Sequence, residues 1–220
     1  MVSLATGLLL GLLLGMRHAL EPDHLAAVSV LVTRRGNAGA GAVLGAIWGV
    51  GHTVALLAVG CVLAAIGSRL PPGWAAGFEL LVATMLVTLG TRAIVRGWRA
   101  GRSPGGPTGD DTGRWRVARR PLIVGLIHGL AGSGALTALV LASLPTAMTR
   151  LCYIALFGIG SAIGMAGMTG LAGWSLARLE ENGRISRGLS IATGAFSLLL
   201  GAFWGGSALR GLLHGFDSLS

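Results

Sequence analysis

Long apolar runs alternate with short polar gaps along the whole chain. Six apolar segments can be delimited, at about 3–33, 39–67, 74–97, 121–143, 150–174 and 189–213. Each is long enough to cross a bilayer as a helix, which takes about 20 residues. Because lipid offers the backbone no hydrogen-bond partners, such segments cross a membrane as helices. The pattern therefore predicts an all-α integral membrane protein with six transmembrane helices.

Composition narrows the class of protein further. The 220 residues are 53% apolar and only 11% charged, whereas a soluble domain is about 25% charged. Mean hydropathy is +0.74. These values exclude a soluble enzyme, a disordered chain and a secreted disulfide scaffold. We expect a single transmembrane domain over residues 1–220, with no enzymatic activity and no resident cofactor.

The first apolar segment is too long for one straight crossing, and residues 21–23 interrupt it with the sequence Glu-Pro-Asp. Pro22 has no N–H to donate to the carbonyl of His18, so the helix should break there. The break should also leave the His18 carbonyl oxygen free as a metal ligand. We therefore expect the first transmembrane helix to be interrupted after His18.

Weak internal similarity divides the chain into two halves. At an offset of about 110 residues, three segments align in order: 15–20 with 125–130, 48–52 with 157–161, and 89–90 with 200–201. A repeat of three spans inverts its second copy, and inverted repeats with interrupted helices are typical of transporters. We expect two inverted three-helix repeats, about 1–97 and 121–213, joined by a loop at 98–120, with helix four interrupted after His128. The alternative is chance similarity between segments rich in glycine and leucine.

The charge pattern predicts the orientation of the chain. The net charge is +9, and all 17 basic residues are arginines. They fall mainly in the gaps between apolar runs, which favours topology signals over nucleic-acid binding. Twelve arginines follow the first, third and fifth spans and three lie on the opposite side. The positive-inside rule then predicts a multi-pass inner-membrane protein with both termini outside and the 98–120 loop in the cytoplasm.

Residues 17–24 hold five ionisable or basic side chains inside an apolar segment. Such groups are unfavourable in hydrocarbon and often mark ion pathways. In an unbroken helix, His18 would point about 140° away from Asp23 and about 120° away from His24. An unwound turn at Pro22 can bring the three side chains to one point.

Two more histidines are expected at a similar depth. His52 lies near the middle of the second segment, and His128 is the counterpart of His18 in the repeat. Imidazole nitrogens with one carboxylate suit nickel, cobalt, zinc or copper better than calcium or magnesium. The alternative for each single histidine is a hydrogen-bonded packing residue. We predict a metal site near the membrane midplane with five ligands: His18, Asp23, His24, His52 and His128.

Three motifs resemble those of the nickel/cobalt transporter family. The signature H-x4-D-H of that family matches residues 18–24, and its G-H-[ST]-x-V element resembles residues 51–54. Residues 128–136 are similar to those of short six-span members that act as urease-accessory or high-affinity nickel-transport proteins. The resemblance implies nickel or cobalt uptake. The second half of the chain does not repeat the first motif, because Ser133 and Gly134 stand at the positions that correspond to Asp23 and His24.

Other functions fit parts of the pattern. An exporter of a metal or another small solute would use the same scaffold. A membrane thiol–disulfide carrier would use Cys61 and Cys152, but these do not follow the repeat offset and we expect them to be small core residues. A His–Asp acyltransferase would need an α/β domain for which the chain has no room. The expected partners are a divalent metal ion as substrate and the lipid bilayer, with no nucleic acid; protein partners and oligomeric state remain open.

Overall fold

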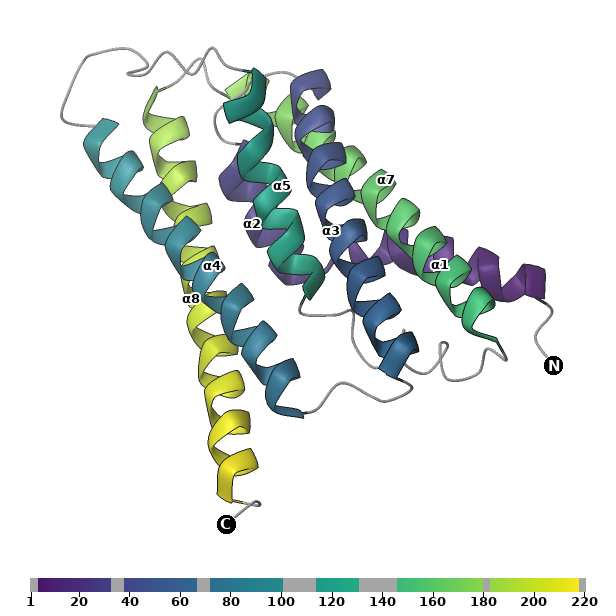
Figure 1. Cartoon of the computed structure of the whole chain (residues 1–220). Coiled ribbons are helices and arrows are strands. Elements are labelled where there is room, and N and C mark those ends of the chain that lie inside the picture. The colour runs from purple at the N-terminus through teal and green to yellow at the C-terminus, as the bar shows by residue number, and fades with distance from the viewer. Residues whose placement is uncertain are drawn as a thin grey trace.

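The computed structural model describes residues 4–32, 38–66, 72–100, 114–130, 146–179 and 183–217. Within these ranges the fold is all-α. The helices are α1 (Leu4–His18), α2 (Pro22–Val32), α3 (Ala38–Ile66), α4 (Pro72–Ala100), α5 (Arg114–Leu130), α7 (Ala147–Leu179) and α8 (Gly183–Asp217) (Figure 1).

Four of these helices are long and apolar enough to cross a membrane. The candidate spans among the described residues are Ala38–Val62, Gly73–Arg99, Ala147–Ser175 and Arg184–Leu213. They belong to α3, α4, α7 and α8. The chain is therefore a multi-pass α-helical membrane protein, and α1, α2 and α5 are shorter helices packed among the four long ones.

The first apolar segment is divided as the sequence predicts. Helix α1 ends at His18 and α2 begins at Pro22. Proline suits the first position of a helix, because its missing N–H would have no partner there. The turn closes differently from our expectation, however. The Glu21 N–H donates to the His18 carbonyl at 3.0 Å, so this oxygen is engaged by the turn and is not left free.

Several helix ends lie outside the predicted apolar segments. Helix α4 continues to Ala100 and α5 begins at Arg114, so both extend into the range predicted as the 98–120 loop. Hydropathy marks only the apolar part of a helix, whereas arginine is a good helix former beyond it. The predicted interruption after His128 lies outside the described residues, because α5 ends at Leu130.

Two antiparallel helix pairs, α3 with α7 and α4 with α8, form the frame of the molecule (Figure 1). Glycines bring the first pair close: Gly49 of α3 lies against Ala162 of α7, and Gly158 of α7 lies against Thr53 of α3. Small residues are the usual means by which membrane helices approach each other. The close approach of α3 to α7 at these positions therefore depends on residues without bulky side chains.

The shorter helices lie along this frame and bring their ends to its centre. Helix α1 packs along α7, where Gly15 faces the backbone of Phe157. Helix α5 packs along α3, where Gly125 faces the backbone of Trp48. As a result, the last residues of α1 and α5 and the first residues of α2 converge beside the middle of α3.

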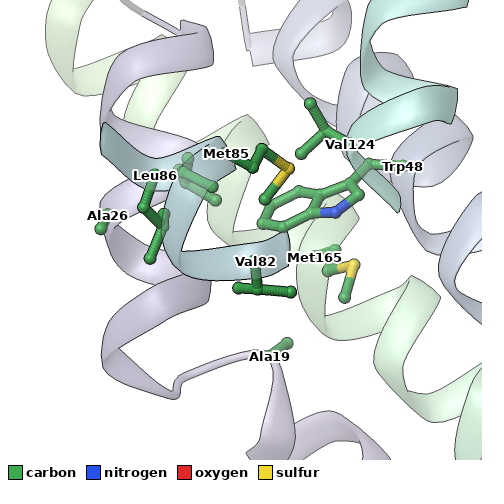
Figure 2. Close-up of a cluster of buried hydrophobic side chains, with 10 residues drawn as sticks. Ala19, Ala26, Trp48, Val82, Met85, Leu86, Val124 and Met165 are labelled. Carbon is green, nitrogen blue, oxygen red and sulfur yellow. The ribbon is translucent and has the colours of Figure 1, made fainter. Parts of the chain in front are cut away.

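The main hydrophobic core adjoins this convergence. Its largest fully buried side chain is Trp48, and Figure 2 shows the indole ring packed among Met85, Val124 and Met165. These residues come from α3, α4, α5 and α7. The core thus joins α3, α4, α5 and α7 next to Ala19, which lies in the turn between α1 and α2.

Candidate metal centre

All five residues predicted to bind metal gather in one buried cluster. His18 ends α1, Asp23 and His24 begin α2, His52 lies in the middle of α3, and His128 lies near the end of α5. Their exposed fractions range from 1% for His24 and His52 to 7% for His18. Because four helices contribute, the cluster forms only when α1, α2, α3 and α5 are packed together.

His24 is at the centre of the cluster. Its ring centroid lies 4.5 Å from that of His18, 4.6 Å from that of His128 and 5.5 Å from that of His52. The rings of His18 and His52 are 5.2 Å apart. Imidazole rings at these separations can direct nitrogens at one shared point, as a metal ion requires.

The Asp23 carboxylate joins two of the histidines. Its Oδ1 lies 3.1 Å from His24 Nδ1 and its Oδ2 lies 3.3 Å from His128 Nε2. The first of these contacts is a hydrogen bond, and when His24 Nδ1 donates it, His24 Nε2 keeps a lone pair. His128 Nε2 lies within ion-pair distance of the carboxylate. Carboxylates commonly orient metal-binding histidines in this way and raise their basicity.

The donor atoms form two overlapping groups. One consists of His18, His24 and His52, and the other of Asp23, His24 and His128. Within each group the donor atoms lie within 4.8 Å of one another. His24 belongs to both groups, so an ion could pass from one to the other without losing contact with this residue.

Several buried ring nitrogens in the cluster have no hydrogen-bond partner. Within the described part of the chain, these are both nitrogens of His18, His52 and His128, and Nε2 of His24. Leaving a buried polar group unpaired costs about 1–3 kcal/mol. Several unpaired imidazoles in one cluster are therefore unfavourable for stability, but they form a suitable donor set for a transition-metal ion.

Two aromatic side chains that the sequence did not single out as site residues line the cluster. Trp48 stacks on His24, with ring centroids 5.4 Å apart and an interplanar angle of 22°. Phe157 lies 5.3 Å from His18. The only sequence signal was their shared place in the internal repeat. These rings fix the orientation of two histidines and keep that side of the cluster apolar.

Glu21 is a further residue that the site prediction left out. Its Oε1 lies 3.0 Å from His18 Nδ1, and its side chain is 49% exposed. The signal available in the sequence was its place among the ionisable residues of the break. The carboxylate is thus in contact with the cluster from the solvent-accessible side.

The two cysteines take no part in the cluster. Cys61 of α3 and Cys152 of α7 are both free and both exposed. Our expectation that they are core residues is wrong, because each lies on the outward face of its helix. Their thiols face away from the packed interior.

The fold and the cluster together define a class: multi-pass membrane proteins with a buried histidine–carboxylate site. The chain is 33% identical over 208 residues to the urease accessory protein UreH of Bacillus sp. (strain TB-90), covering 91% of this chain and 90% of that protein. It therefore belongs to the UreH group of the nickel/cobalt transporter family and is not an enzyme. No family model matches the chain, and no solved structure matches it.

Proposed function

We propose that this protein carries nickel or cobalt ions into the cell through the buried His/Asp cluster. The observation that carries this proposal is the meeting of four imidazoles and one carboxylate, with several ring nitrogens unpaired. The ion is the transported substrate, and the protein needs no resident cofactor. The five proposed ligands are those of the sequence prediction: His18, Asp23, His24, His52 and His128.

The donor set favours nickel or cobalt in two respects. Imidazole nitrogen suits these ions, whereas a soft ion such as copper(I) selects thiolate or thioether ligands. The described cysteines are exposed elsewhere on α3 and α7. Asp23 supplies a buried negative charge, the only one among the described side chains, which offsets part of the unfavourable transfer of a dication into the membrane.

The proposed architecture is two inverted three-helix repeats that cross the membrane six times. Reciprocal contacts support it. Gly15 faces the backbone of Phe157, and at an offset of about 110 residues Gly125 faces the backbone of Trp48.

The same exchange occurs at other contacts between the two halves. Gly51 of the first half faces Leu122 of the second half. Gly160 of the second half faces Leu12 of the first half. Between α4 and α8, Gly90 lies against Gly194, and its counterpart Gly201 lies against Ala83. A pseudo-two-fold axis in the membrane plane produces such paired contacts. We assign residues 1–97 and 121–213 to the two repeats of a single domain.

The proposed orientation has the 98–120 loop in the cytoplasm and both termini outside. In Figure 1, helices α2, α4 and α7 end, and α3, α5 and α8 begin, at the upper end of the molecule. These helix ends, together with the three gaps between them, hold twelve of the seventeen arginines. An inside-negative potential then favours inward movement by about 2.3 kcal/mol per charge per 100 mV, and by about twice that for a dication.

Nickel accumulation by intact cells tests the function. Cells that lack other nickel uptake should accumulate radioactive Ni²⁺ or Co²⁺ when they produce the wild-type chain, and elemental analysis of protein purified without chelator should identify the bound ion. The control is the His24→Ala variant at equal membrane abundance. If cells that produce the protein accumulate less metal than cells that lack it, the protein is an exporter. If its production leaves Ni²⁺ and Co²⁺ accumulation unchanged, both uptake and export of these metals are excluded.

A further inference from the structure

Glu21 occupies a distinctive place beside the cluster. It lies in the turn between α1 and α2, directly before Pro22. Its carboxylate contacts His18 Nδ1 at 3.0 Å, yet its side chain is 49% exposed whereas that of His18 is only 7% exposed. One carboxylate is therefore exposed on the surface of the chain and contacts a proposed ligand at the same time.

In the part of the chain that the structure describes, few carboxylates are available to attract a cation. Among the side chains that the structure describes, the carboxylates are those of Glu21, Asp23 and Glu79. Asp23 is buried, and Glu79 lies on the exposed face of α4. The net charge of the chain is +9, which disfavours the approach of a dication. An exposed carboxylate at the mouth of a site raises the local cation concentration and the rate of capture.

The position of Glu21 along α2 gives the direction of capture. Helix α2 starts just after Glu21 and ends at the upper end of the molecule, with the helix ends that flank the arginine-containing gaps of the sequence (Figure 1). Glu21 is therefore at the opposite end of α2 from those gaps. Under the proposed orientation this end faces the outside of the cell.

We propose that Glu21 is the capture ligand of the transport site. Its carboxylate binds a divalent ion from the outer aqueous phase and passes it to the group of His18, His24 and His52. It does not remain bound to the ion in the buried state. This inference rests on the proposed function and adds the residue that loads the site.

The transfer follows from the contact between Glu21 and His18. Glu21 Oε1 lies within ion-pair distance of His18 Nδ1, and neither ring nitrogen of His18 has a hydrogen-bond partner among the described residues. An ion that binds the carboxylate is therefore one imidazole away from the buried donors. Asp23 then holds the second group together through His24 and His128.

The test compares Glu21→Gln with Glu79→Gln in the full-length protein, using Ni²⁺ as the probe. Both variants remove one exposed carboxylate with little change of volume, so Glu79→Gln controls for surface charge. Removing a steering charge should lower the initial uptake rate at subsaturating Ni²⁺ by about 10-fold or more in Glu21→Gln. Its maximal rate and the equilibrium Ni²⁺ affinity of the purified protein should stay close to wild type. Glu21→Asp should retain most of the uptake, and Glu79→Gln should match wild type.

Two outcomes overturn the inference while the proposed function stands. In the first, Glu21→Gln takes up Ni²⁺ at the rate of Glu79→Gln, so Glu21 captures nothing. In the second, Glu21→Gln loses equilibrium affinity by about 10-fold or more, the scale expected for a residue that supports the bound state. Failure of the wild-type protein to bind or transport Ni²⁺ would instead overturn the proposed function.

Discussion

Each histidine of the cluster has a different set of neighbours, and the neighbours predict how much each contributes. His24 belongs to both donor groups and contacts Asp23, whereas His18 and His52 belong to one group. His128 shares its group with Asp23, which also orients it. The shared residue should therefore be the most sensitive to substitution.

Alanine substitution should rank the histidines. His24→Ala should weaken Ni²⁺ binding by more than about 100-fold, beyond the effect of losing only an orienting partner. His18→Ala and His52→Ala should follow, and His128→Ala should weaken binding by about 10-fold. The measurement is Ni²⁺ titration of purified protein whose size-exclusion profile matches wild type.

His214→Ala is the matched control, because this histidine lies near the end of α8. It should bind Ni²⁺ like wild type. Equal affinity for wild type, His18→Ala and His24→Ala would show that the imidazoles are packing residues and not ligands.

Proton competition gives a second check at the residue scale. A histidine binds a metal only through a deprotonated nitrogen, so protons and Ni²⁺ compete for the same atoms. An ordinary histidine has a pKa near 6.5 and an ordinary aspartate near 3.9. Ni²⁺ affinity should therefore fall below about pH 6, more steeply than one titration because several imidazoles compete together.

The measurement is Ni²⁺ binding between pH 5 and pH 8 with unfolding followed in parallel. A carboxylate alone would lose affinity only near pH 4. Affinity that stays constant from pH 8 to pH 5 would remove the histidines from the ion's ligands.

The sequence predicts the residues of the site better than its surroundings. Pro22 breaks the helix through its own local chemistry, so the break and the approach of His18, Asp23 and His24 could be derived from the sequence. Trp48, Phe157 and Glu21 could not be assigned to the site, because an aromatic or acidic residue acquires that role only through packing. The His18 carbonyl was misjudged for a related reason, since the N–H of Glu21 closes the turn onto it.

At the scale of helices, the close approach of α5 to α3 sets the position of His128. A Cβ atom at Gly125 would collide with the backbone carbonyl of Trp48, which cannot move aside as a side chain could. Gly125→Ala should therefore push α5 away from α3. A Cβ atom at Gly167 of α7, by contrast, would have no neighbouring side chain or helix within 4 Å.

The two glycines provide a matched pair of substitutions. Gly125→Ala should lower the free energy of unfolding by about 1–3 kcal/mol, as overpacking does. Gly167→Ala should leave it unchanged or raise it by up to about 1 kcal/mol, because alanine favours a helix. The measurement is thermal unfolding in detergent by circular dichroism. A Gly125→Ala protein as stable as Gly167→Ala would contradict the tight α3–α5 contact.

At the scale of the whole molecule, the two halves share contacts but not chemistry. His128 corresponds to His18 in the repeat, whereas Ser161 corresponds to His52. Ser161 Oγ donates to the Phe157 carbonyl within its own helix. The pseudo-symmetry therefore supplies the scaffold, and the first half supplies four of the five proposed ligands. Hydropathy could indicate this scaffold but not the pairing of α3 with α7, which depends on glycines far apart in the sequence.

The final prediction concerns the orientation of the chain in the membrane. Uptake through Glu21 requires that the end of α2 next to Glu21 faces the outside of the cell. Cys61→Ser and Cys152→Ser give a background without thiols, since these are the two cysteines of the chain. In that background, Gly106→Cys in the 98–120 loop should react with an impermeant maleimide only after the cells are permeabilised, because arginine-rich loops stay in the cytoplasm. Ser68→Cys, in the gap between α3 and α4, should react in intact cells. Labelling of Gly106→Cys but not Ser68→Cys in intact cells would invert the topology, and Glu21 would then face the cytoplasm as the capture ligand of an exporter.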